Sequence, residues 1–527
     1  MFIKRTKAKS GGKTYIYIQL VESVWRDGRP THRVVANLGR EDLLDPGQVD
    51  RLIASLAPYG RAKVASAEDV EILKAREYGT VYVLSHLWSH LGFDGLFRGL
   101  AARRRLGFDV EAGVRAIVFS RVVDPCSERA TIRWLDRVYA PDLEAPELHQ
   151  LYRTLDFVYE VLDDVQVGLI ERVTARLVSD LRLVLFDTTS VYFEGDGPLG
   201  LARFGYSRDK RSDRPQVVLG LFVTPEGYPL FHMILPGNTS DVYAFRQAMD
   251  ELRSRLPVGE IIVVVDRGMV SEANLAALRS AGIGYIAGTR MRHLTTREVL
   301  SRAGRYHVVD RNLHVKEVRM PGDERYVVCY NSEEELRDRE EREAMVTYLK
   351  AEFSKGVGSL LKNSVARRYL TIHGAKVELN ESRIREDARY DGKWVLTTNT
   401  ALSPAELALS YKGLWKVEDA FRTIKNPLEA RPIYHWKDER VRAHLSLCVL
   451  AYLLERVIDV ALEKANLGIT AQTALEELSQ IRACETAIGR ERWITTTTLT
   501  DRQRTILNAL EVPIPERIRA SECIVAK

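Results

Sequence analysis

The chain has 527 residues, of which 45% are hydrophobic and 28% charged, so its length predicts several domains and its composition excludes a disordered or collagen-like protein. The longest uncharged apolar run, 445–454, is too short to span a bilayer, and we expect no membrane partner. Five cysteines lie far apart without zinc-ligand spacing, and no secretory signal is visible. These features predict a cytoplasmic location.

The first forty residues are basic. They hold nine Lys or Arg against Glu22 and Asp27, a balance of +7 in a chain whose net charge is +5. Residues 14–20 and 32–38 alternate in places, and Asp27-Gly28 lies between them, which predicts a small basic β-hairpin. The charge favours a polyanion partner, although a solvated surface hairpin explains it equally well.

Residues 68–178 have apolar positions at three- and four-residue spacing, which predicts helices. After residue 180 the pattern predicts three strands and then a βαβ-like alternation. This order indicates an α/β sheet of mixed direction. The expected strands are 183–193, 216–224, 228–235, 260–266 and 284–287, and the expected helices are 242–256 and 271–281.

A block from 296 to 397 follows, with strands near 305–330 and 369–397 around a charged helical stretch, 332–365. A single long helix is then predicted from Ser403, because Ser, Pro404 and Glu406 form a strong helix-start signal. Asn426-Pro427 ends it, and further helices are expected through most of 437–512.

Two acidic residues are candidates for a ligand site. Asp187 and Asp266 each follow apolar residues of a predicted strand, where a carboxylate can be exposed at the edge of a sheet. Taken alone, each is more often an ordinary strand-end aspartate that caps a turn.

The long helix supplies a third acid. At 100° per residue, five aromatic and charged side chains fall within about 40° of one line, beside a separate apolar face. An amphipathic helix also has a polar side, but packing does not require two large aromatics among its charges. The five are Tyr411, Trp415, Glu418, Arg422 and Lys425.

Three carboxylates without a Cys/His cluster favour hard cations such as Mg²⁺ or Mn²⁺. Two such ions would activate water and stabilise the leaving oxygen of a phosphodiester. Basic and aromatic residues also alternate in the segment 203–211, where Arg208, Lys210 and Arg211 could contact nucleic acid; a solvated loop is the alternative.

These motifs resemble the DDE transposases of bacterial insertion sequences, in particular the family-four group. Asp187 in LFDTTSVYFEG matches the first acid, Asp266 in VVVDRGMVSEANL the second, and Glu418 in YKGLWKVEDAFRTIK the third. Tyr411 and Lys425 match the signature of the third-acid helix. Leu414 stands where the signature has Arg, and Lys412 or Lys416 are candidates to replace it. The segments GYSRDKRSDRPQVVLGL, FHMILPGNTSD and RPIYHWKDERVRAHL also look like the family.

The resemblance implies a ribonuclease-H-like core, interrupted by a partly β insertion, that cuts and rejoins DNA with two Mg²⁺ or Mn²⁺ ions held by the three acids. It also implies a homodimer bound to terminal inverted repeats and target DNA, located at the nucleoid. Trp415 would stack on a base, and Tyr411, Arg422 and Lys425, with the basic loop and with Lys4, Arg5 and Lys13, would contact DNA. The alternatives are a catalytically silent DNA-binding relative and another ribonuclease-H-like nuclease. The expected regions are 1–65 (basic, β-rich, DNA-binding), 66–178 (helical, DNA-binding), 179–295 (core), 296–397 (insertion), 398–465 (core) and 466–527 (helical).

Overall fold

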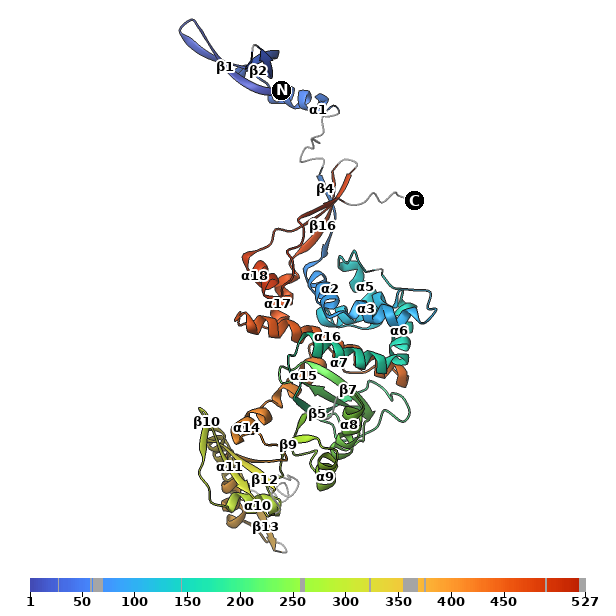
Figure 1. Ribbon diagram of the computed structural model, residues 1–527, viewed down its shortest axis with the longest axis vertical. Coiled ribbons are helices and arrows are strands. Elements are labelled where there is room, and N and C mark those ends of the chain that lie inside the picture. Colours follow the sequence, from blue (N-terminus) through green and yellow to red (C-terminus); the bar gives the residue numbers. More distant parts are fainter. Residues whose placement is uncertain are drawn as a thin grey trace. The chain divides into compact units, whose positions relative to one another are not determined.

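The computed structural model of the chain describes residues 1–26, 28–56, 59, 70–143, 145–255, 261–321, 324–353, 368–373, 376–488 and 491–520 (Figure 1). Asp27 of the predicted turn, and residues 354–365 of the predicted charged helix, therefore lie outside the described residues. The chain divides into two units. The smaller comprises Met1–Ala75, Cys484–Thr496 and Arg517–Lys527, and the larger comprises Arg76–Ala483 and Thr497–Glu516.

An antiparallel three-stranded sheet begins the smaller unit. The predicted hairpin is confirmed as β2 (Lys13–Arg26) and β3 (Arg29–Arg40), and β1 (Phe2–Ser10) adds a strand that pairs with β2. Alternating Tyr and Ile residues at the start of β2 suit a pleated surface. The short helices η1 (Glu41–Leu43) and α1 (Pro46–Leu56) follow.

A second sheet combines β4 (Val70–Glu77) with β16 (Arg482–Ile488), β17 (Glu491–Thr496) and β18 (Ile518–Ala520), in the order β18-β17-β16-β4. The predictions of helix throughout 68–178 and of a helical C-terminal region are therefore wrong for these strands. The reason is that the sheet joins segments from opposite ends of the chain, and such long-range pairing leaves little local signal.

Helices dominate the first part of the larger unit, as predicted. Their core includes Trp88, which stacks on Phe97 and meets Phe119 edge-on. The later helix α16 (Asp438–Lys464) packs against α4 and α6. The helices are α2 (Gly79–Leu91), α3 (Phe93–Ala102), α4 (Val110–Val123), α5 (Glu128–Arg137), α6 (Leu148–Glu160) and α7 (Leu162–Arg176).

The strands of the predicted core sheet follow one another along the chain in the expected order. In space the order is β9-β8-β5-β6-β7, with β5, β8 and β9 parallel and β6 antiparallel to both of its neighbours. This is the ribonuclease-H-like arrangement. The helix α8 packs on the sheet through Phe245, whose ring lies beside Phe186. The elements are β5 (Leu183–Tyr192), β6 (Gln216–Val223), β7 (Pro229–Pro236), α8 (Asp241–Arg255), β8 (Ile262–Val265), α9 (Glu272–Ser280) and β9 (Gly284–Gly288).

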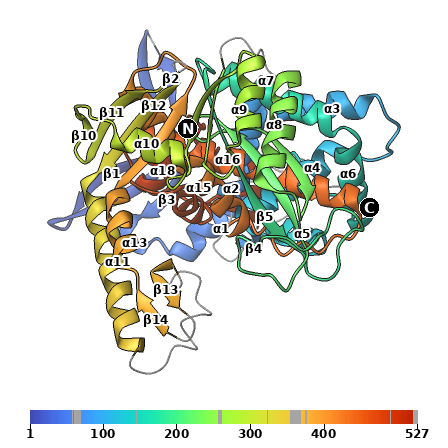
Figure 2. The ribbon, with the colours of Figure 1, turned by 90° about the horizontal axis from the view of Figure 1, so that it is seen from below.

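Most strands of the inserted block extend this sheet, and the other two form a separate hairpin. The last strand of the block, β15 (Lys393–Thr398), pairs antiparallel with β9, and the order β10-β11-β12-β15 continues the core sheet to nine strands. A small hairpin lies beside the end of the long helix α11, where Leu349, Tyr369 and Leu370 pack together (Figure 2). The block contains α10 (Leu294–Ser301), β10 (His307–Asp310), β11 (Leu313–Arg319), β12 (Arg325–Asn331), α11 (Ser332–Phe353), β13 (Leu370–His373), β14 (Lys376–Leu379), α13 (Glu381–Asp387) and η5 (Ala388–Tyr390).

The predicted single helix after Ser403 is two helices, α14 (Pro404–Lys412) and α15 (Trp415–Lys425). The capping box of Ser403 and Glu406 forms as expected. The break falls at Gly413, because glycine gives an α-helix little intrinsic support, and the two helices pack on different strands: α14 on β9 and α15 on β5. Two short helices, α17 (Ala471–Leu478) and α18 (Asp501–Ala509), follow α16.

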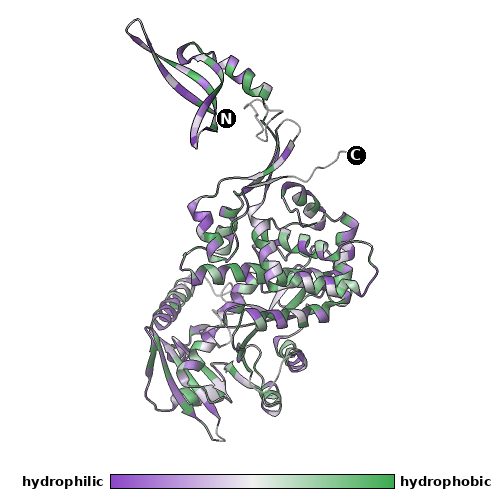
Figure 3. Cartoon of the chain, turned by 45° about the horizontal axis from the view of Figure 1, so that its top comes forward, coloured by the Kyte–Doolittle hydropathy of each residue, from purple (hydrophilic) through white to green (hydrophobic). Residues whose placement is uncertain are grey.

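Hydropathy follows this architecture. Hydrophobic residues gather on the core strands and along α16, whereas much of α11 is hydrophilic (Figure 3). Within the described residues, no helix is both long enough and apolar enough to cross a membrane.

Candidate active site

The first two predicted acids lie side by side in the larger unit. Phe186 of β5 pairs with Val265 of the parallel strand β8. Asp187 directly follows Phe186, and Asp266 directly follows Val265. The shared register therefore brings the two carboxylates to the same place on the sheet. Their charges interact, since Asp266 contributes to the raised pKa of Asp187.

Asp187 is half-buried and hydrogen-bonded. Burial raises the pKa of its carboxyl to about 7, although the nearby Arg208 guanidinium and the backbone N–H of Thr188 oppose this rise. Arg208 Nη1 lies 3.5 Å from Asp187 Oδ1, and Thr188 N donates to the same oxygen at 2.7 Å. Two half-buried carboxylates close together favour a bound cation, so the donor set fits a divalent metal.

Asp241 is an acid that the sequence analysis missed as a site residue. It begins α8 and accepts hydrogen bonds at 2.8 Å from Arg208 Nη2 and at 2.9 Å from Thr188 Oγ1. Its charge also contributes to the raised pKa of Asp187. The available signal was its position at the end of FHMILPGNTSD, directly before a predicted helix. Arg208, predicted as a DNA contact, is thus bound between two carboxylates.

Tyr411 supports the second acid. Its hydroxyl donates to Asp266 Oδ1 at 3.0 Å, and burial together with Asp266 raises the pKa of Tyr411, so the group stays protonated. A Cβ at Gly288 would lie 2.3 Å from this hydroxyl oxygen, so only glycine leaves room for the tyrosine against β9. The sequence pattern offered no sign of this close approach.

Glu418 lies on the exposed side of the first turn of α15, the helix that packs on β5. In the described part of the chain, the three acids do not form a group with all ligand oxygens within 4.8 Å of one another. The structure therefore brings Asp187 and Asp266 together and places Glu418 on the adjoining helix.

The predicted helical stripe is divided by the break at Gly413. Tyr411 belongs to α14, and the other four members belong to α15. Trp415 is 52% exposed, outside the core, and Lys416 Nζ lies 4.1 Å above the centre of its ring. Arg422 is exposed and pairs with Asp419 at 2.9 Å.

Lys425 differs from the expected exposed phosphate contact. It is buried, and its Nζ lies 3.0 Å from Asp209 Oδ1, which Arg431 also contacts at 2.6 Å. Burial lowers the pKa of Lys425 and Asp209 opposes the shift. Lys412, a candidate to replace the missing signature Arg, lies 3.7 Å from Asp310.

The remaining predicted DNA contacts are surface residues. In the loop after β5, Lys210 is exposed and has φ 57°, and Arg211 pairs with Asp213 at 2.9 Å. In the smaller unit, Lys4, Arg5 and Lys13 lie on β1 and β2; Arg5 and Lys13 are exposed, and Lys4 is half-buried.

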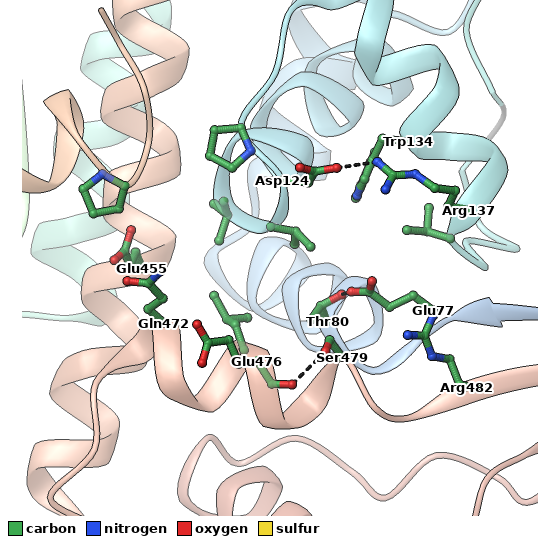
Figure 4. A pocket seen from close by; sticks show the side chains of 16 residues that line it. Glu77, Thr80, Asp124, Trp134, Arg137, Glu455, Gln472, Glu476, Ser479 and Arg482 are labelled. Carbon is green, nitrogen blue, oxygen red and sulfur yellow. Dashed lines mark hydrogen bonds and ion pairs between the residues drawn. The ribbon is translucent and has the colours of Figure 1, made fainter.

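A polar cavity of about 420 Å³ lies apart from these residues, and none of the predicted site residues lines it (Figure 4). Glu455 of α16 and Glu476 of α17 border it. Burial raises the pKa of Glu455 to about 7, with further contributions from Asp459 and Asp419.

Comparison with known families agrees with this geometry. The family described as "Transposase DDE domain" matches residues 179–454, which is more than half of the chain. The chain belongs to the DDE transposases. The family "IS1634 family transposase, N-terminal domain" matches residues 3–68, so this is an insertion-sequence transposase, an enzyme of DNA cleavage and strand transfer whose family depends on divalent metal. Neither match names the family-four group, and that finer assignment stays a prediction.

No curated protein matches this transposase. Among solved structures it is similar to a piggyBac transposase in a synaptic complex with hairpin DNA. The two are 10% identical, the TM-score is 0.37, and the alignment covers 76% of this chain and 78% of the other.

Proposed function

We propose that Asp187, Asp266 and Glu418 are the catalytic and metal-binding residues of this transposase, and that they hold two Mg²⁺ or Mn²⁺ ions. The observation that carries this is the shared register of β5 and β8, which places two aspartates together beside the helix of the third acid. The bound ions would activate the attacking water or 3′-hydroxyl and stabilise the leaving oxygen.

The surrounding side chains of this chain have defined parts in that chemistry. Tyr411 fixes one oxygen of Asp266 by hydrogen bonding, so that its other oxygen keeps a constant direction. Arg208 offsets the charge of Asp187, and Asp241 holds the guanidinium in place. These contacts prearrange the aspartates before DNA arrives.

We further propose the DNA partners. The exposed basic strands of residues 1–40, with the helical region up to about 178, would bind the terminal inverted repeats, and a homodimer would join two ends in one complex with target DNA. Action on chromosomal DNA would place the protein at the nucleoid. The observation in support is the row of exposed basic side chains on β1 and β2.

The test is cleavage of the element's own end by the purified full-length chain with Mg²⁺, with products mapped to the nucleotide. Asp187→Asn, Asp266→Asn and Glu418→Gln should each abolish cleavage and leave end binding largely intact. Asp419→Asn is the matched control, because Asp419 is the next residue on the same helix but pairs with Arg422. Wild-type cleavage by any of the first three variants would contradict the assignment.

A further inference from the structure

A second group of possible metal ligands lies in the larger unit. Ligand atoms of Glu128, His435 and His444 all lie within 4.8 Å of one another. Glu128 begins α5, His435 lies in the segment between α15 and α16, and His444 lies near the start of α16. Spacing in the sequence cannot indicate this group, because folding alone brings the first residue to the other two.

The three side chains are suited to coordination. His435 Nε2 lies 3.2 Å from Glu128 Oε1, and the rings of the two histidines have centroids 5.2 Å apart. Glu128 and His444 are buried and His435 is half-buried, so water competes little for these ligand atoms.

The group also has an entry path. All three residues line a cavity of about 870 Å³. Arg121 borders the same cavity, and its positive charge opposes a metal; its Nη1, however, donates to the backbone carbonyls of Leu428 and Glu429 at 3.4 and 3.2 Å, which holds the guanidinium there. The remaining walls carry arginines such as Arg431 and Arg440, so a water or an anionic oxygen could complete the coordination.

We propose that Glu128, His435 and His444 bind one zinc ion, with its fourth position open to this cavity. Two imidazoles and one carboxylate are a donor set that zinc accepts readily, whereas Mg²⁺ and Ca²⁺ prefer oxygen ligands alone. Zinc bonds of about 2.0–2.2 Å in a tetrahedron place ligand atoms roughly 3.4 Å apart. The pair at 3.2 Å is close to this spacing, and all three ligand atoms lie within 4.8 Å of one another.

The ion would join parts of the fold that are distant in sequence. Bound zinc would connect α5 of the helical region to α16 and to the segment that follows the third-acid helix. The competing arrangement is a metal-free ion pair between Glu128 and a protonated His435. Zinc binding and protonation exclude each other at His435, so the two arrangements predict different results.

The experiment uses the full-length chain with Asp187→Asn and Asp266→Asn, so that the catalytic aspartates do not bind the added metal. After dialysis against a chelator, zinc chloride is titrated by calorimetry and the melting temperature is followed. We expect one zinc per chain and a melting temperature that rises with zinc concentration, while magnesium chloride gives no rise. Tetrahedral Co²⁺ should give visible ligand-field absorption at the same site.

Glu128→Gln and His435→Gln should each abolish the zinc stoichiometry, the melting shift and the cobalt spectrum. His149→Gln is the matched control, since His149 lies 3.2 Å from Glu147 in an exposed pair to which the described residues add no third ligand, and it should behave like the parent. If either test variant does not fold, the cobalt spectrum of the folded parent still distinguishes a tetrahedral metal site from a metal-free ion pair. Absence of zinc binding by the parent, or equal binding by His435→Gln and His149→Gln, would overturn the proposal and favour the ion pair.

Discussion

The hydroxyl of Tyr411 donates a hydrogen bond of 3.0 Å to Oδ1 of Asp266 across the junction between α14 and β8. The contact joins the predicted signature helix to the second acid, and it exists because Gly288 leaves space for the tyrosine ring. The tyrosine is therefore placed to orient a carboxylate.

We predict that Tyr411→Phe slows cleavage at least about tenfold, because a lost hydrogen bond to a charged group costs about 1.5–3 kcal/mol and about 1.4 kcal/mol is a factor of ten in rate. The phenylalanine ring fills the same space, so the melting temperature should change little. Single-turnover cleavage of an end fragment measures the rate. Tyr348→Phe on α11 is the control, because Tyr348 is exposed. Unchanged cleavage by Tyr411→Phe would show that the hydroxyl of Tyr411 does not need to orient the carboxylate of Asp266.

The order of the core sheet and the positions of its two aspartates could be predicted from the sequence, because buried strands and the helices between them have distinct local patterns. The register that places Asp187 beside Asp266 was not predicted, because it depends on the pairing of β5 with β8. The break at Gly413 could not be predicted with equal ease, since the residues on either side keep a helical period and only tertiary packing separates α14 from α15.

Contacts that join distant segments were also beyond the sequence pattern. Asp241 and Arg208 meet only after β6 and β7 have folded between them, and β4 finds its partner β16 from the other end of the chain. The buried pairing of Lys425 with Asp209 likewise depends on a loop whose charges had suggested an exposed surface. The local sequence pattern indicates helices and strands, whereas these pairings arise only when distant segments pack against one another.

Trp415 is predicted to contact DNA. Because the side chain is 52% exposed, Trp415→Ala should change the free energy of unfolding by no more than about 0.5 kcal/mol. Loss of stacking on a base should cost roughly 1–3 kcal/mol of binding in the later complexes, so first nicking should survive and strand transfer should slow. Trp415→Phe should restore most of the rate. A large fall in melting temperature with normal strand transfer would contradict this.

The basic sheet of the smaller unit should govern the salt dependence of end binding. In the triple variant Lys4→Gln, Arg5→Gln, Lys13→Gln, the plot of log K against log salt should become less steep. The magnitude of its negative slope should fall by about 2–3, since each lost phosphate contact removes about 0.9. Fluorescence anisotropy at several salt concentrations measures the slope. A control with the same loss of charge replaces three exposed basic residues of α11, Arg337, Arg339 and Lys350, by Gln. Equal slopes for the two triple variants would contradict the prediction that residues 1–40 supply phosphate contacts in end binding.

Glu455 predicts a pH dependence of stability. Its folded pKa of about 7 is above the ordinary 4.5, because the carboxyl is buried near Asp459 and Asp419. A raised folded pKa means that the folded state holds this proton more tightly than the unfolded state. The resulting stability is fully present below pH 4.5 and is lost as the pH rises through 7.

Glu455→Gln removes the ionisation and keeps the shape of the side chain. At pH 8 the variant should be more stable than the parent by about 1–3 kcal/mol, since each pKa unit corresponds to about 1.4 kcal/mol. Near pH 4.5 the two should be alike. Urea unfolding at both pH values measures the difference. Glu476→Gln, at an exposed residue bordering the same cavity, is the control and should show no such pH-dependent gain. An equal gain for Glu455→Gln at both pH values would show that packing, and not a buried charge, separates it from the parent.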